Sequence, residues 1–112
     1  EPGIGGHPRG MAIDIILRAE NGEIVPMGTS FDYFDEDPAK NPAARHFTDL
    51  PPAVLKNRKI LEDAMRQAGQ EFGREILPLP TEWWDFRFMP EDYNRFAPLS
   101  DHDLPEHRRL VF

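Results

Sequence analysis

The clearest alternation of apolar and polar positions in the chain runs from residue 11 to residue 17. This pattern predicts a β-strand, because successive side chains of a strand point to opposite faces. Asp14 lies on one face of this strand, between Ala12 and Ile16. The other face carries Met11, Ile13, Ile15 and Leu17. A glycine-rich turn that contains His7 and Pro8 precedes the strand.

Asp14 gives this strand its chemical interest. A carboxylate among apolar neighbours is costly to bury without a counter-charge. A cation would remove that cost, and His7 lies just upstream as a second ligand. We therefore hypothesise a metal ion held by His7 and Asp14. The alternative is an edge strand whose Asp14 simply points into water.

The segment after this strand contains a turn, and the middle of the chain contains one helix. Asn21-Gly22 favours a hairpin turn over residues 20–23, with residues 24–27 as the returning strand. Apolar residues at helical spacing predict a helix over residues 50–68, capped by Thr48 or Asp49 and ended by Gly69. Its expected core face consists of Val54, Leu55, Leu61, Met65 and Ala68.

An aromatic strand is predicted over residues 81–88, after a connector or short strand over residues 72–79. In it, Glu82 and Asp85 bracket two tryptophans. Burial beside a large apolar wall raises the pKa of a carboxylate toward the range of a general base. In an extended strand the two acids point to opposite faces, so both reach one site only through a bend. The alternative is a core strand whose acids both face water.

Other polar residues outside these segments are expected to lie on the surface. The acidic run over residues 31–37 lacks the glycine and glutamate spacing of an EF-hand, which excludes that calcium site. Asp32 is its member expected to be partly buried. The tail from Pro90 onward is expected to wrap the domain, and His46, His102 and His107 to be exposed.

Composition narrows the partners and the available ligands. The 112 residues suffice for one small domain, with 39% hydrophobic and 29% charged residues. The net charge of −7 argues against nucleic acid and anionic membranes as partners. No apolar run approaches the roughly 20 residues of a membrane helix. The chain has no cysteine, so a metal must be bound by His, Asp or Glu. The absence of cysteine is compatible with either a reducing or an oxidising compartment.

Two motifs together resemble one known family. Residues 5–14, Gly-Gly-His-Pro-Arg-Gly-Met-Ala-Ile-Asp, resemble the Ser-x-His-x-x-Gly-x-Ala-x-Asp motif of the zinc D-alanyl-D-alanine dipeptidases, the VanX-like enzymes. Residues 82–85, Glu-Trp-Trp-Asp, resemble the family's Glu-x-x-His motif, usually written Glu-Trp-Trp-His. Residues 22–28 and 31–32 are also similar to the intervening segment. The resemblance spans the chain from Gly5 to about Phe88.

The resemblance implies a role for each matching residue. His7 and Asp14 match the first two ligands of one zinc ion. Asp85 stands where the third ligand, a histidine, is expected. Glu82 matches the catalytic acid/base, and Asp32 falls where the family places an acid that holds the substrate ammonium group.

The resemblance also implies a fold and a reaction. The fold is α+β, a small antiparallel sheet flanked by helices, as in DD-peptidase-like zinc enzymes. The reaction is hydrolysis of D-alanyl-D-alanine or a closely related cell-wall peptide. The family has a long N-terminal half that contains an arginine. We therefore expect residues 1–112 to be the C-terminal portion of a single zinc dipeptidase domain, with its N-terminal half cleaved off or present as a second chain.

Departures from the family pattern leave more than one function open. Asp85 adds a negative charge to the ligand set, so reduced activity, a higher working pH or another divalent ion is expected. Gly5 replaces the serine of the motif. The leading prediction is a zinc dipeptidase of peptidoglycan, in wall recycling or vancomycin resistance. The alternative is a weak or inactive homologue that binds D-Ala-terminated peptides. A third interpretation is an unrelated structural domain with coincidental motifs. A measurement of zinc content would distinguish this domain from the other two.

Overall fold

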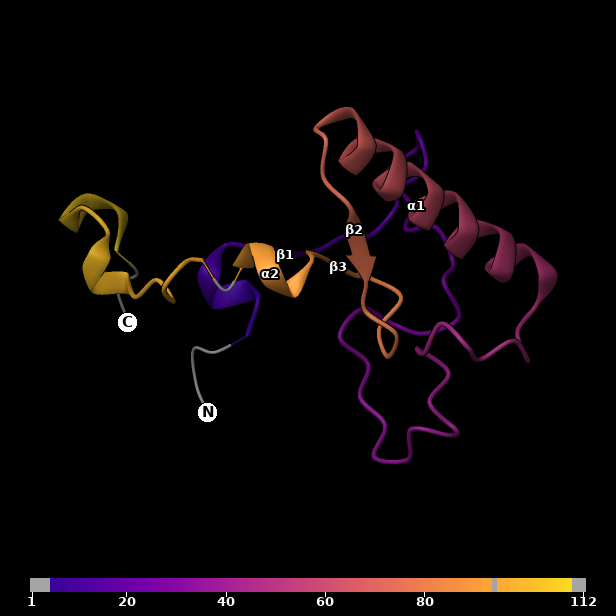
Figure 1. Cartoon of the computed structure of the whole chain (residues 1–112). Coiled ribbons are helices and arrows are strands. Elements are labelled where there is room, and N and C mark those ends of the chain that lie inside the picture. Colours follow the sequence, from indigo (N-terminus) through magenta and orange to yellow (C-terminus); the bar gives the residue numbers. More distant parts are fainter. Residues whose placement is uncertain (1–4, 94, 110–112) are drawn as a thin grey trace.

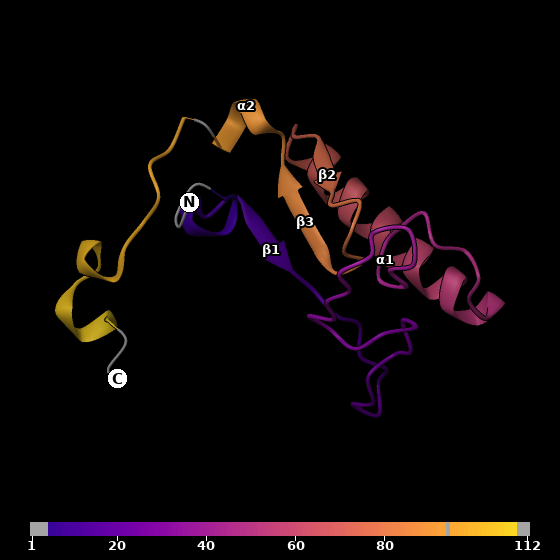
Figure 2. The ribbon, with the colours of Figure 1, turned by 90° about the horizontal axis from the view of Figure 1, so that it is seen from below.

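A three-stranded antiparallel sheet forms the centre of the fold, in the order β1–β3–β2 (Figures 1 and 2). The computed structural model describes residues 5–93 and 95–109. The strands are β1 (Ala12–Asp14), β2 (Ile76–Pro78) and β3 (Asp85–Phe88). In the central strand β3, every residue pairs with β1, β2 or both. Together with the helices, this sheet confirms the α+β class.

The strand predicted over residues 11–17 is shorter than expected. Regular pairing between β1 and β3 covers Ala12 to Asp14. One further bond follows, from Ile15 N–H to the Trp84 carbonyl at 2.9 Å. The segment that precedes β3 does not continue the pairing with β1, because residues 82–84 form a turn rather than part of the strand. The predicted aromatic strand is shortened at the same place.

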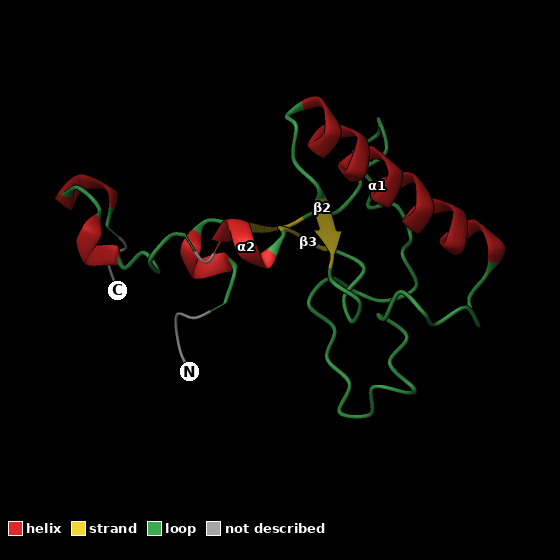
Figure 3. Ribbon diagram, in the orientation of Figure 1, coloured by secondary structure: helices red, strands yellow, loops and turns green. Residues whose placement is uncertain are grey.

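The helix α1 (Pro52–Glu71) packs on one side of the sheet, beside β2 (Figures 1 and 3). Its N-cap residue is Pro51, whose side chain has no hydrogen-bonding group, so the predicted capping by Thr48 or Asp49 is wrong. The predicted end at Gly69 is also wrong. Gly69 is buried inside the helix, and the left-handed glycine that follows the helix is Gly73, with φ of 67°.

The core lies between α1, β3 and the loops that precede them. Trp83 and Trp84 are buried in it, with their rings edge to face at a centroid distance of 5.3 Å. The Trp83 indole N–H donates to the Thr29 hydroxyl at 2.8 Å, which satisfies its polar edge. The buried cluster consists of Met27, Ala43, Leu61, Trp83, Trp84 and Phe86.

The predicted turn forms at residues 19–23, but its returning strand does not. Ala19 N–H donates to the Glu23 carbonyl at 2.8 Å, and Gly22 has φ of 86°. In the part of the chain that the structure describes, residues 24–27 add only an isolated bridge between Arg18 and Ile24. The bond from Val25 N–H to the Leu17 carbonyl, at 2.9 Å, belongs to this bridge.

The tail does not wrap the domain as predicted. It contains α2 (Pro90–Tyr93) and the short 3₁₀ helices η2 (Asp101–Asp103) and η3 (Glu106–Arg108). Its yellow end lies away from the sheet and α1 in Figures 1 and 2. The radius of gyration is accordingly 16.0 Å, against about 13 Å for a compact domain of this length. Among the described helices, none has the length and apolar character needed to cross a membrane.

Candidate metal centre

His7, Asp14 and Asp85 converge at one end of the β1–β3 pair. The His7 Nε2 atom lies 3.2 Å from Asp14 Oδ1 and 3.0 Å from Asp85 Oδ2. One ligand atom from each residue lies within 4.8 Å of the others. Within residues 5–93 and 95–109, this is the one group of three or more such residues arranged to hold a metal ion.

Sheet register and a glycine turn produce this convergence. Asp14 and Asp85 are directly opposite each other in the antiparallel pair. Like charges in that position repel and destabilise the sheet unless a cation lies between them. His7 begins the 3₁₀ helix η1 (His7–Arg9). Gly10, with φ of 70°, ends η1 and returns the chain into β1, which brings the imidazole back over the two carboxylates.

Arg87 holds the Asp85 side chain through two hydrogen bonds. Its Nε donates to Oδ1 at 2.9 Å, and its Nη2 donates to Oδ2 at 2.7 Å. Only 1% of the Asp85 side chain and 16% of the Arg87 side chain are exposed. Residues two apart in a strand share a face, so this pair is readable from the order Asp-x-Arg once β3 is assigned. The sequence interpretation did not identify it.

Arg45 supports the same strand from the other side. Its guanidinium donates to the backbone carbonyls of Leu79 at 2.8 Å and Asp85 at 2.9 Å, and it forms an ion pair with Glu62 at 3.1 Å. It also lies 4.7 Å from the centre of the Phe86 ring. This arginine fixes the backbone of the third predicted ligand. No local sequence signal distinguishes it from a surface arginine.

Glu82 precedes β3 in a turn rather than in an extended strand. Its N–H donates to the Leu79 carbonyl at 3.3 Å, and its own carbonyl accepts from the Asp85 N–H at 3.4 Å. Burial raises the pKa of Glu82, and the negative charges of Asp85 and Asp14 raise it further. This direction suits a general base, which needs a pKa closer to neutrality than that of a free glutamate.

The two carboxylates that face His7 have opposite pKa shifts. Burial raises the pKa of Asp14, with a further increase from Asp85 and a partial offset from His7. Burial also acts to raise the pKa of Asp85, but its hydrogen bonds from Arg87 and His7 outweigh that effect and hold it below the ordinary value. Asp85 is therefore the firmly ionised member of the pair.

Asp32 lies near this cluster in a strained turn. It has φ of 63°, in the left-handed region that aspartate tolerates better than most residues. Its charge raises the pKa of both Asp14 and Glu82. Asp32 is exposed to solvent, contrary to the expectation of partial burial. His46, His102 and His107 are exposed, as expected, and lie outside the cluster.

The arrangement of donor atoms fits a divalent cation. Tetrahedral zinc with ligands at about 2.0–2.1 Å has ligand atoms about 3.3 Å apart, close to the two distances from His7 Nε2 to the carboxylate oxygens. One imidazole N–H cannot point at both oxygens well, whereas a cation among the three atoms attracts all of them. Four acids act on one another here, which also favours a cation: Asp14, Asp32, Glu82 and Asp85.

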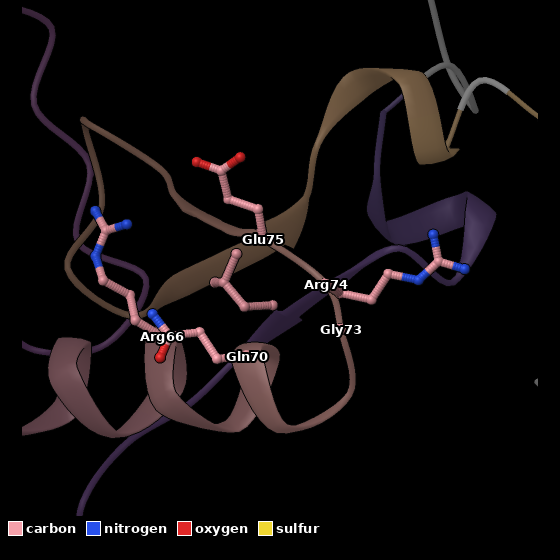
Figure 4. Close-up of a pocket in the computed structure, with 6 residues that line it drawn as sticks. Arg66, Gln70, Gly73, Arg74 and Glu75 are labelled. Atoms are coloured by element: carbon pink, nitrogen blue, oxygen red, sulfur yellow. The ribbon is translucent and has the colours of Figure 1, made fainter.

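A cavity of about 260 Å³ adjoins the predicted base. Glu82 lines it together with Tyr33, Phe34 and Asn41. A larger hollow of about 470 Å³ lies at the end of α1 and the start of β2, where Figure 4 shows Arg66 and Gln70 near one another. Its lining includes no member of the metal cluster. The smaller cavity is likewise not lined by His7, Asp14 or Asp85, but of the two cavities it is the one that Glu82 lines.

Comparison with known proteins identifies the family of this chain. Residues 5–103 match the Peptidase_M15 family, described as D-ala-D-ala dipeptidase. The chain is 37% identical over 80 residues to a D-alanyl-D-alanine dipeptidase of Escherichia coli strain K12, covering 71% of this chain and 36% of that protein. It is 35% identical over 101 residues to a dipeptidase of the same name from Enterococcus faecium, covering 88% and 42%.

A third relative of the same name, from Enterococcus faecalis, is 32% identical over 90 residues, covering 78% of this chain and 38% of that protein. The chain thus spans about two fifths of the length of the curated relatives it matches. The family match covers both motifs of the site, from the turn that contains His7 to the strand that contains Asp85. The chain belongs to the D-ala-D-ala dipeptidase family of metallopeptidases.

Proposed function

We propose that this chain forms the metal centre of a zinc-dependent D-alanyl-D-alanine dipeptidase. His7, Asp14 and Asp85 hold one zinc ion, and Glu82 is the general base. The observation that carries the proposal is the convergence of His7 Nε2 with one oxygen from each of two opposed aspartates. Membership of the family supports the substrate, and the neighbouring acids support the need for a cation.

The residues have separate tasks in this proposal. A bound zinc ion would polarise the scissile carbonyl and make a water molecule more acidic. Glu82 takes a proton from the attacking water and gives it to the leaving amine. Its raised pKa makes Glu82 a stronger base toward the attacking water than an exposed glutamate is. Asp32, close enough to raise the pKa of Glu82, offers a carboxylate to the substrate ammonium group.

Metal content and dipeptide turnover together test this proposal. The protein should contain one zinc per chain by elemental analysis and release D-alanine from D-alanyl-D-alanine. His7→Ala should lose zinc and turnover together, because it removes the atom shared by both carboxylates. Glu82→Gln should keep the zinc and lose turnover by about 10²–10⁴-fold, the usual contribution of a general base.

Two results would contradict the assignment. Zinc that remains bound in His7→Ala would show that the metal lies elsewhere. Turnover that survives in Glu82→Gln would show that Glu82 is not the general base. A matched control is His46→Ala, since His46 is an exposed histidine outside the cluster. Its zinc content and turnover should equal those of the unmodified protein.

A second function is favoured by one observation, the firm bond between Asp85 and Arg87. Both oxygens of Asp85 already accept hydrogen bonds from Arg87, which weakens Asp85 as a ligand. A homologue with a weak metal site would bind D-Ala-terminated peptides without cutting them. Equilibrium dialysis with D-alanyl-D-alanine distinguishes this case, because the dipeptide would be retained and recovered intact in the presence of zinc.

A further inference from the structure

The guanidinium of Arg87 and the imidazole of His7 approach the same oxygen of Asp85. Its Oδ2 atom accepts from Arg87 Nη2 at 2.7 Å and lies 3.0 Å from His7 Nε2. A carboxylate oxygen has two lone pairs, so one can face Arg87 while the other faces the point between His7 and Asp14. A metal ion at that point would share Oδ2 with the guanidinium.

Arg87 is a permanent positive charge in this position. Its guanidinium is ionised at all working pH values, and its fork matches the carboxylate in a bidentate pair. Register also places Arg87 opposite Ala12 on β1, next to the pair formed by Asp14 and Asp85. The arginine therefore neutralises part of the negative charge that would attract a divalent ion.

We propose that Arg87 competes electrostatically with the metal ion for Asp85, and so sets how tightly the His7–Asp14–Asp85 cluster holds a metal. In the metal-free protein, Arg87 holds the buried Asp85 carboxylate and keeps the β1–β3 end of the sheet folded. In the metal-bound protein, the same guanidinium repels the ion and weakens its binding. This inference rests on the proposed metal centre and assigns to Arg87 a positioning role outside the ligand set.

The strength of this competition follows from charge and distance. A unit charge and a divalent ion a few ångströms apart interact strongly even at the effective dielectric constants of protein surfaces. Removing the guanidinium while keeping a hydrogen-bonding side chain should therefore raise zinc affinity at least tenfold. Replacing the bidentate guanidinium by another positively charged group should change the zinc affinity little.

Zinc binding to the full chain, measured by competition with a chromophoric chelator, tests the proposal. Arg87→Gln should bind zinc at least tenfold more tightly than the unmodified protein, and Arg87→Lys should stay within about threefold. Lys59→Gln is the matched control, because it removes one positive charge from an exposed ion pair with Asp63 on α1. Its zinc affinity should not change.

Thermal unfolding supplies a readout that does not depend on activity. In excess chelator, Arg87→Gln should unfold at a lower temperature than the unmodified protein, because Asp85 loses its partner. Added zinc should raise the melting temperature of this variant by more than it raises that of the unmodified protein. If this variant folds only with zinc present, the same conclusion holds, because the metal then replaces the guanidinium.

The outcomes separate this inference from the function on which it rests. Unchanged or weaker zinc binding in Arg87→Gln, with binding lost in His7→Ala, would overturn the competition while the metal centre stands. An increase in zinc affinity in Arg87→Lys as large as that in Arg87→Gln would also overturn the proposed competition. Failure of every variant and of the unmodified protein to bind zinc would overturn the metal centre and this inference together.

Discussion

The Glu82 carboxylate is placed where its charge costs the folded protein free energy. Burial and the charges of Asp85 and Asp14 raise its pKa above the ordinary value of 4.5. The folded state therefore binds the Glu82 proton more tightly than the unfolded state does. Between the ordinary and the raised pKa, stability falls as the pH rises, and above both values the full cost is present.

We predict that Glu82→Gln stabilises the metal-free protein at pH 7. The gain in the free energy of unfolding should shrink as the pH falls through the raised pKa, and vanish below about pH 4, where the glutamate is neutral in both states. Urea unfolding in excess chelator at several pH values measures it. Glu20→Gln, at an exposed turn, is the control. An equal gain in both variants would contradict the prediction.

Asp85 and Arg87 are expected to depend on each other. Asp85→His alone leaves the largely buried guanidinium without its carboxylate, and breaking a buried pair typically costs about 3–5 kcal/mol. Adding Arg87→Gln should recover much of that stability, and zinc should bind more tightly because the imidazole supplies a nitrogen ligand of the kind that zinc prefers. Chemical unfolding and chelator competition on both variants measure these effects. A single variant as stable as the unmodified protein would contradict the coupling.

At the same scale, the sequence predicted some positions of the site and missed others. His7, Asp14, Glu82 and Asp85 belong to short motifs that are visible in the linear chain. Arg87 was missed although the predicted strand over residues 81–88 already placed it on the same face as Asp85. Arg45 was missed because its partners are carbonyls more than 30 residues away in the chain, a relation that spacing cannot reveal.

Gly69 shows how an element can be misjudged by its residues alone. A glycine near the end of an apolar repeat usually marks the end of a helix, yet α1 continues to Glu71. A Cβ at position 69 would clash with the Ile76 side chain and come within 2.7 Å of the Arg74 carbonyl oxygen. Glycine is therefore required by the close approach of α1 to β2, which no helical periodicity can predict.

We predict that Gly69→Ala destabilises the protein, although alanine is the better helix former. Overpacking against a backbone atom typically costs about 1–3 kcal/mol. Gln67→Ala, at an exposed position of the same helix, should be neutral or slightly stabilising. Urea unfolding of the two variants gives the comparison. Stabilisation by Gly69→Ala would show that the contact with β2 relaxes at little cost.

The molecule as a whole stabilises its site with a small core. Among the residues that the structure describes, the buried apolar cluster has six members and the sheet has three short strands. The chain is also acidic, with 20 acidic against 13 basic residues, and several of the acids lie around the metal cluster. A cation that binds only the folded state would relieve this repulsion and join η1 to β1 and β3.

Zinc should therefore raise the melting temperature of the whole protein. At free zinc about 100 times the dissociation constant, mass action adds about 2.7 kcal/mol, which corresponds to a shift on the order of 10 °C for a domain of this size. The measurement is differential scanning calorimetry in zinc and in excess chelator. His7→Ala should lose the shift, because His7 is the link between η1 and both aspartates. If His7→Ala retained the full shift, zinc would be acting on other acidic groups of the chain, and the stabilisation could not be assigned to the three-residue cluster.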